Sequence, residues 1–344
     1  MTNPILVEVT RGALVESVHR GAIAVVDSKG KRVVAIGNVD RPVYPRSAVK
    51  LIQALPLVES GAADAYGFGP AELALACASH NGEARHTTLA ASMLARAGRS
   101  VADLECGTHI PSYEPAAADL IRAGESPNAL HNNCSGKHSG FVCLACHMGV
   151  EVRDYVTETH PVMRAVTAAL RDTTGAALGP DVCAIDGCSI PTYGIPLDRM
   201  ALAFARLATG EGVSPERGKA AKRLMAACMA EPFYVAGTGR FCTDIMTAFA
   251  GALFVKGGAE GVCIAAIPAL GLGIALKCDD GSGRGTDAMV ASVIVALMSP
   301  EDAARDAIMS RLYSPVATRR GVKAGEIRPV AGLVESIREG RPVG

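Results

Sequence analysis

The sequence has no net charge to offer a highly charged partner. Lysine plus arginine and aspartate plus glutamate both number 34 among its 344 residues, so the formal net charge is 0. Proteins that bind nucleic acid or an anionic membrane surface usually rely on an excess of positive charge against phosphates. We therefore expect neither nucleic acid nor a membrane as a partner.

The sequence also lacks a hydrophobic run long enough to cross a membrane. Its most apolar stretch, residues 261–276, is shorter than the roughly 20 residues that a spanning helix needs, and Pro268 and several glycines interrupt it. The opening residues, MTNPILVEVTRG, contain neither a basic segment nor an apolar run followed by small residues. They predict no secretory signal, so we expect a cytoplasmic protein.

No internal repeat and no linker-like segment divides the chain. Hydrophobic residues make up 49% of it and charged residues 20%, which is typical of globular proteins. The length allows one large domain or two lobes. Because the 11 cysteines are odd in number and no export signal is present, we expect them to be reduced thiols.

The two ends of the chain predict strands. Residues 22–26 and 32–36 are rich in β-branched residues and flank a turn at 27–30, which predicts a hairpin. Later strands are predicted at 253–256, 262–267 and 271–277, followed by a helix near 286–298.

The middle of the chain predicts helices. Apolar residues recur at helical spacing in SAVKLIQALPLVESGAA, and Pro45 precedes them, so a helix should begin near Ser47. Further helices are predicted at 82–97, 114–123, 160–173, 197–209 and 215–230. We therefore expect one globular α/β (α+β) unit, residues 1–344. Residues 1–46 and 247–335 would form a lobe containing a mainly antiparallel sheet flanked by helices, and residues 47–246 a mainly helical lobe.

Ser47 and Lys50 have the spacing of a serine nucleophile and its base. Residues three apart share a helix face, so a neutral lysine could accept the proton of the serine. A free lysine has a pKa near 10.4, so burial or a nearby cation would have to lower that pKa. The spacing alone is weak evidence, because Ser28 and Lys31 share it in a turn where both should be solvated.

Two loops carry an unusual concentration of reactive side chains, HNNCSGKHSG at 131–140 and IDGCSIPTYG at 185–194. The first is not a nucleotide-binding P-loop, because His131 stands where that motif needs its first glycine, and a histidine follows Lys137. Cys134 and Cys188 could meet and, with a third ligand and water, form an open tetrahedral zinc site.

The residues alone leave that third ligand open. His138 would be the ordinary choice, whereas Lys137 would have to lose its proton to bind a metal. Two buried free cysteines are the alternative. Asn133, His138 and Asp186 flank these positions and could hold substrate or water, although a polar loop would explain them equally well.

Other reactive side chains have ordinary explanations. Cys143 and Cys146 lie within an apolar helical run, which predicts core packing. Ser79, in CASHNGE, could be the N-cap of the helix that follows it. Lys256 ends a hydrophobic strand, where a lysine usually reaches for solvent.

Five segments, YPRSAVK, CASHNGE, NNCSGKHSG, DGCS and FVKGG, together resemble the asparaginase II family of rhizobial type, which is distinct from the bacterial asparaginases with a threonine nucleophile. The segments follow one another between residues 44 and 258, and the strand-rich ends of the chain fit as well. The resemblance implies a fold similar to serine β-lactamases and glutaminases.

The resemblance also implies a set of site residues and a partner. Two serine–lysine pairs, Ser47 with Lys50 and Ser79 with Lys256, would share one pocket. One zinc ion per chain would be bound by Cys134, Lys137 and Cys188, with a water as the fourth ligand. The two lysines and the zinc would disfavour one another's charge and so provide the required lowering of a lysine pKa. The family suggests a homodimer.

The expected function is hydrolysis of L-asparagine to aspartate and ammonia. Ser47 would attack the side-chain amide, Lys50 would take its proton, and Ser79 and Lys256 would relay protons. One alternative is a glutaminase, another serine–lysine amidohydrolase or a β-lactam-reactive protein. A second alternative is a catalytically silent zinc or amino-acid sensor.

Overall fold

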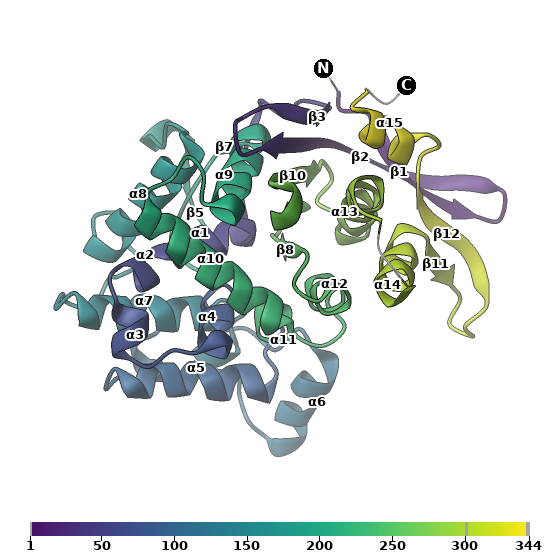
Figure 1. Ribbon diagram of the computed structural model, residues 1–344. Helices are drawn as coiled ribbons and strands as arrows, with labels where there is room; N and C mark the ends of the chain where they lie inside the picture. Colours follow the sequence, from purple (N-terminus) through teal and green to yellow (C-terminus); the bar gives the residue numbers. More distant parts are fainter. Residues whose placement is uncertain (1, 300–301, 342–344) are drawn as a thin grey trace.

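The computed structural model describes residues 2–299 and 302–341, and it contains an eight-stranded antiparallel sheet formed by the two ends of the chain (Figure 1). The strand order is β11-β12-β1-β2-β10-β9-β8, and β3 pairs with β2 beside that path. This arrangement confirms the mixed α/β fold and the antiparallel sheet predicted from the sequence. The strands are β1 (Ile5–Arg11), β2 (Leu14–Asp27), β3 (Arg32–Ile36), β8 (Phe254–Gly257), β9 (Val262–Ile267), β10 (Leu272–Cys278), β11 (Ser314–Ala317) and β12 (Lys323–Pro329).

Strand β2 joins the two parts of this sheet. Its first half pairs with β1 and is largely exposed, whereas its second half is buried and pairs with both β3 and β10. Strand β9, with the sequence VCIAAI, is buried along its whole length, as expected for a strand covered on both faces. The predicted hairpin is confirmed, but its first strand begins at Leu14, eight residues before the predicted start; the three later strands agree within one residue.

Helices cover both faces of the sheet. Helix α9 (Leu197–Thr209) packs on β2, β9 and β10, and α13 (Gly283–Leu297) packs on β1, β10 and β12 from the other side (Figure 1). At Gly273 of β10, a Cβ atom would lie 1.9 Å from the Ala201 carbonyl oxygen of α9. The close approach of this helix to the sheet therefore requires glycine at that position.

Residues 50–249 supply most of the other helices, and they pack beside the sheet (Figure 1). These are α1 (Lys50–Gln53), α2 (Leu55–Glu59), α3 (Ala62–Ala65), α4 (Pro70–Ala76), α5 (Ala84–Arg96), α6 (Glu114–Ala123), α7 (Ser135–His147), α8 (Pro161–Thr174), α10 (Pro215–Ala230), α11 (Pro232–Ala236) and α12 (Phe241–Phe249). Two short pairs of strands lie among them, β4 (Pro42–Val43) with β7 (Ile195–Pro196), and β5 (Cys183–Ile185) with β6 (Pro191–Tyr193). Near the end of the chain, α14 (Asp302–Leu312) and α15 (Leu333–Glu339) pack on α13.

The helix predicted to begin near Ser47 is broken into short pieces. A 3₁₀ helix, Arg46–Val49, leads into α1 and then α2. Pro56 lies in the first turn of α2, where its missing N–H costs nothing, but it cannot continue a preceding helix. Among the described residues, no helix is both long and apolar enough to span a membrane.

Candidate active site

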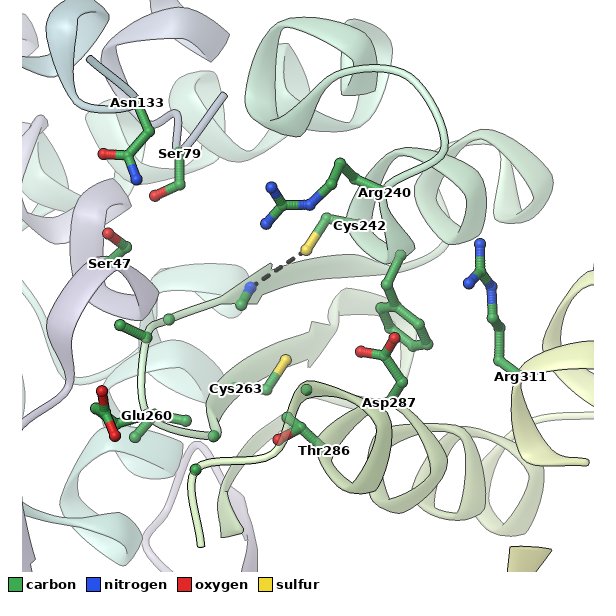
Figure 2. Close-up of a pocket in the computed structure, with 18 of the residues that line it drawn as sticks. Ser47, Ser79, Asn133, Arg240, Cys242, Glu260, Cys263, Thr286, Asp287 and Arg311 are labelled. Atoms are coloured by element: carbon green, nitrogen blue, oxygen red, sulfur yellow. Dashed lines mark hydrogen bonds between the residues drawn. The ribbon is translucent and has the colours of Figure 1, made fainter. Parts of the chain in front are cut away.

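Ser47 and Ser79 both line a pocket of about 560 Å³ (Figure 2). The pocket lies where the 3₁₀ helix Arg46–Val49, the loop after α4 and the turn between β8 and β9 meet the starts of α12 and α13. The sheet therefore supplies one wall and the helical segments supply another. The two predicted serines, from separate segments of the chain, face one another across this space.

Lys50 is buried next to Ser79, and only 1% of its surface is exposed. Its Nζ atom donates hydrogen bonds to Ser79 Oγ at 2.9 Å, to Cys134 Sγ at 3.0 Å and to the carbonyl oxygen of Ala78. Three polar groups from two segments of the chain thus surround the Lys50 amine. Lys50 thus connects the second serine to the cysteine loop.

The 3₁₀ helix explains why Ser47 and Lys50 are neighbours. Residues three apart eclipse one another in a 3₁₀ helix, and the Lys50 backbone N–H donates to the Ser47 carbonyl oxygen. Among the hydrogen bonds of the described residues, none involves Ser47 Oγ, so this hydroxyl is free to meet a ligand. The hydrogen bond that sequence spacing predicted for Lys50 with Ser47 is made with Ser79 in this structure.

Ser79 belongs to a loop that is fixed to the segment before α12. Its backbone N–H donates to the Val235 carbonyl oxygen at 2.9 Å, and Glu83 accepts hydrogen bonds from the backbone N–H and the hydroxyl of Thr238. The N-cap of α5 is Glu83. The interpretation of Ser79 as a helix cap is therefore wrong, and its hydroxyl faces the pocket instead.

Lys256 lies one residue before the end of β8. It is buried, with only 2% of its surface exposed. The interpretation as a solvent-seeking lysine is therefore wrong. Burial, followed by the charge of Lys50, lowers the pKa of Lys256 to about 8. Its Nζ donates to the Gly257 carbonyl oxygen at 2.7 Å. A buried lysine with a lowered pKa is thus present beside the pocket.

The glycine at 258 allows the turn after β8 to touch the helix of Ser47. A Cβ atom on Gly258 would lie 2.8 Å from the Pro45 carbonyl oxygen and 3.1 Å from the Ala48 nitrogen. Backbone atoms cannot rotate away as a side chain can, so any larger residue would separate the two segments. Gly258, the second glycine of FVKGG, thus sets the distance between the end of β8 and the Ser47 helix.

Cys134, Lys137 and Cys188 meet in the protein interior, from the start of α7 and the loop before β6. Lys137 Nζ donates to Cys188 Sγ at 3.0 Å. A hydrogen bond from Cys188, with the charges of Lys50 and Lys137, holds the pKa of Cys134 well below its usual value despite burial. The two nearby amines therefore favour the thiolate form of Cys134.

This cluster fits the ligand preferences of zinc. Two sulfur atoms and one amine nitrogen converge, and zinc takes such S and N ligands in a tetrahedron, with water in an open position. Lys137 would have to be neutral to bind, because a protonated amine has no free lone pair. The cluster lies beside the serine pocket, because Cys134 shares the amine of Lys50 with Ser79.

Asp186 links the Cys188 loop to the 3₁₀ helix that contains Ser47. Its Oδ2 accepts a hydrogen bond from Arg46 Nε at 2.9 Å, and Arg46 directly precedes Ser47 with a positive φ of 51°. Burial alone would raise the pKa of Asp186, but the charges of Lys137 and Arg46 hold it below its usual value. Asp186 therefore serves as a link between two parts of the site.

The other two candidate substrate-binding residues lie in different environments. Asn133 lines the pocket, and its Oδ1 lies 3.0 Å from Cys134 Sγ. His138 is fully buried and hydrogen-bonds Tyr155 through Nδ1 at 2.6 Å, away from the pocket lining. Its Nε2 has no hydrogen-bond partner among the described residues, and burial lowers the pKa of His138 well below its usual value.

Several pocket residues carry no signal in the sequence. Arg240 and Asp287 line the pocket from the starts of α12 and α13, and Cys242 accepts a hydrogen bond from the Gly257 N–H at 3.2 Å (Figure 2). Neither segment resembles a recognised motif. Only the fold brings them opposite the serines.

A second group of possible metal ligands lies at the turn between β10 and α13. It consists of His19, Cys278 and Asp280. Arg284 Nε donates to His19 Nε2 at 3.2 Å, so His19 carries its proton on Nδ1 and donates to Asp280 at 2.6 Å. These polar atoms satisfy one another, and the nearby guanidinium disfavours a cation. The group therefore serves to hold the turn.

The family model of L-asparaginase II matches residues 7–329 of the chain. No curated protein matches its sequence. Among solved structures, it is similar to a β-lactamase from Burkholderia ambifaria at 13% identity and a TM-score of 0.34, covering 85% of this chain and 92% of that one. It is also similar to a β-lactamase from Mycobacterium bovis, at 14% identity and a TM-score of 0.36, covering 77% of this chain and 89% of that one. A third similar structure is Mglu in its Tris and glutamate form, at 18% identity and a TM-score of 0.34, covering 83% of this chain and 61% of that one.

Proposed function

The chain belongs to the L-asparaginase II family, and from this premise we propose that it hydrolyses L-asparagine to aspartate and ammonia with Ser47 as the nucleophile. One observation carries the proposal: Ser47 and Ser79 line the same pocket, and the buried amine of Lys50 donates a hydrogen bond to Ser79. This arrangement provides a nucleophile, a proton carrier and a space for a small substrate in one place.

The first half of the reaction would form an acyl-enzyme. Ser47 Oγ attacks the side-chain amide carbon, and its proton passes to the amine of Lys50. The amide nitrogen then takes a proton and leaves as ammonia, while the acyl group stays on Ser47. The free hydroxyl of Ser47 and the shared face of the 3₁₀ helix support this assignment.

The second half would release aspartate. A water molecule attacks the acyl carbon and loses a proton to the lysines, and the Ser47 oxygen regains one as it leaves. Lys256, with a pKa of about 8, is partly neutral near pH 7 and suits a proton relay with Ser79. Backbone N–H groups at the start of the Arg46–Val49 helix would stabilise the oxyanion.

Zinc would be held by Cys134, Lys137 and Cys188, one ion per chain, with a water as the fourth ligand. When bound, it would supply a positive charge that orients a substrate oxygen. Asn133, on the pocket wall beside Cys134, would contact the substrate, and Asp186 would fix the Cys188 loop against the Ser47 helix. His138, buried behind the cluster, would contribute by packing and by its hydrogen bond to Tyr155 rather than by touching substrate.

The test is a side-by-side assay of ammonia release from L-asparagine and L-glutamine, with a chromogenic β-lactam as a third substrate. We expect asparagine to be preferred, and Ser47→Ala to abolish turnover. Faster glutamine hydrolysis would favour the glutaminase alternative, and β-lactam turnover would favour the β-lactam-reactive one. Tight asparagine binding without any turnover would identify a sensor.

The proposal extends to a homodimer, as the family resemblance implied, and to a cytoplasmic location. Light scattering of the purified protein should give twice the mass of the 35.4 kDa chain. A monomer at working concentrations would overturn this part of the proposal and leave the chemistry intact.

A further inference from the structure

The Lys50 amine contacts two separate loops through one side chain of each. It donates to Ser79 Oγ at 2.9 Å and to Cys134 Sγ at 3.0 Å. Both hydrogen bonds form only if the two loops keep a fixed distance from one another. The residues that directly follow these two contacts, His80 and Ser135, are fully buried and bonded to each other.

The His80 imidazole joins the two loops. Its Nδ1 accepts a hydrogen bond from the Gly82 N–H at 3.2 Å, so the ring carries its proton on Nε2. Nε2 donates to Ser135 Oγ at 2.9 Å, and that hydroxyl donates in turn to the Leu130 carbonyl oxygen at 2.8 Å. A backbone contact runs beside this link, from the His80 N–H to the Asn133 carbonyl oxygen at 3.1 Å.

The surroundings of the His80 ring fix its orientation. It stacks on the His86 ring with the centroids 4.7 Å apart, and His86 stacks on Phe233 at 4.5 Å. Burial lowers the pKa of His80 well below its usual value, so the ring is neutral and Nδ1 stays an acceptor. A buried polar group whose hydrogen bonds are all satisfied makes its neighbourhood rigid. His80 is therefore a stiff connection between the loops.

His80 cannot act on the substrate directly. Both of its ring nitrogens are already bonded, and its side chain is fully buried. Its effect on the pocket passes through its neighbours in the chain, because Ser79 precedes His80 and Cys134 precedes Ser135. Loss of the link would let one of these contacts move away from the Lys50 amine.

We propose that His80 is a positioning residue that acts through its hydrogen bond to Ser135. The link keeps Ser79 and Cys134 at the spacing at which both contact the Lys50 amine. The inference rests on the proposed function for the part that Ser79 and Lys50 play in proton transfer. Because a misplacement of about 1 Å can cost about 10²-fold in rate, loss of the link should lower kcat and leave KM nearly unchanged.

Two amide substitutions separate the two nitrogens of the ring. In His80→Gln the amide nitrogen takes the place of Nε2 and can still donate to Ser135, whereas the shorter His80→Asn side chain reaches only the place of Nδ1. We expect His80→Gln to keep kcat within about fivefold of wild type, and His80→Asn to lose about 10- to 100-fold. Equal losses in the two variants would overturn the proposal.

The other end of the link has its own matched pair of variants. Ser135→Ala removes the acceptor and should match His80→Asn in kcat. Ser139→Ala is the control, because Ser139 lies one turn later in α7, is equally buried, and bonds to the Ser135 and Ala90 carbonyl oxygens. It should keep the wild-type kcat even if thermal unfolding shows a loss of stability. Equal losses of kcat in both serine variants would contradict the link.

A double-mutant cycle tests whether His80 acts through Ser79. If it does, adding His80→Asn to Ser79→Ala should change kcat by less than about threefold, because the group that His80 positions is already absent. Losses that multiply in the double variant would indicate a general effect on the fold and overturn the proposal.

Crystal structures give a readout that does not depend on turnover. We would compare wild type, His80→Gln and His80→Asn at the same zinc content, and we expect the spacing of Ser79 Oγ and Cys134 Sγ to change only in His80→Asn. If asparagine is hydrolysed but this spacing survives in His80→Asn, the inference is overturned and the proposed function stands. If wild type shows no turnover but His80→Asn loses the spacing, the proposed function is overturned and the inference stands.

Discussion

Lys50 Nζ lies 2.9 Å from Ser79 Oγ and donates a hydrogen bond to it, although the serine three residues before Lys50 in the chain is Ser47. The two serines therefore play unequal roles: one is held by a buried amine, and the other has a free hydroxyl. A proton leaving Ser47 would arrive at an amine that already contacts Ser79. The pocket thus links the two serines through one lysine.

We predict that only Ser47 becomes acylated. Ser47→Ala should reduce kcat by about 10³-fold or more, since removal of a nucleophile leaves only binding and oxyanion contacts. Ser79→Ala should slow the reaction by about 10²- to 10⁴-fold, the usual range for loss of a proton-transfer group, and the acyl group should still form. Rapid quenching followed by peptide mass mapping locates the acyl group. An adduct on Ser79 would reverse the assignment.

We predict a rise in activity with pH that depends on Lys256. With a pKa of about 8, its neutral fraction increases about tenfold for each pH unit below that value and levels off above it. If neutral Lys256 accepts a proton, kcat/KM should follow this curve between pH 6 and pH 9. Lys256→Arg should remove the rise, because arginine stays protonated. The pH profile of kcat/KM for both proteins is the measurement.

Stability gives an independent check on the same lysine. The folded-state pKa of Lys256 lies below the value near 10.4 of an unfolded lysine. Between these values the unfolded chain binds the extra proton, so this residue should make the free energy of unfolding increase from about pH 8 to pH 10. Urea unfolding of wild type and Lys256→Met at both pH values measures the difference. An equal change in both proteins would contradict a buried amine of lowered pKa.

We predict that Gly258→Ala impairs catalysis by separating two segments of the pocket. The new methyl group would contact the backbone at Pro45 and Ala48, at a cost typical of overpacking, about 1–3 kcal/mol. Gly257→Ala is the matched control, since its Cβ would meet only Cys242 Sγ at 3.8 Å. Steady-state kinetics and thermal unfolding of both variants test this. Equal kinetics in the two would argue against the close contact.

We predict that zinc occupancy depends on Cys134 and Cys188. Cys188→Ser should lose most of the metal, whereas Cys146→Ser should retain it, because Cys146 lies at the end of α7 outside the cluster. Metal analysis of protein purified without chelators gives the ratio per chain. Active wild-type protein without zinc would show that Cys134, Lys137 and Cys188 are structural residues rather than metal ligands.

The sequence predicted the parts of the fold that depend on local patterns. Helices α6, α9 and α10 have the predicted bounds, since their apolar residues recur at helical spacing. The break between α1 and α2 was not predicted, because the alanine and leucine residues around Pro56 favour a continuous helix. Strands β11 and β12 were missed because they are partly exposed and contain no continuous apolar run.

The site was predictable where a motif carried the signal. Ser79, Cys134 and Cys188 stand in segments whose composition is unusual, and Ser47 has a telling spacing to Lys50, so these residues could be named before the fold was known. The fold decides which segments meet, and spacing along the chain does not reveal it. The hydrogen bond from Lys50 to Ser79 and the positions of Arg240 and Asp287 in the pocket depend on those meetings. Neither could be read from single residues.

The pairing of β2 with β10 has a consequence for how the protein is made. Residues 21–27 bond to residues 272–278, and the same sheet carries Lys256 on β8. During synthesis both serines emerge long before the strand that brings the second lysine to them. Contacts so distant in sequence are slow to form, so the helical segments should be structured while the pocket is still incomplete. Activity should therefore appear as one of the last events of folding, after most of the helical signal has been gained.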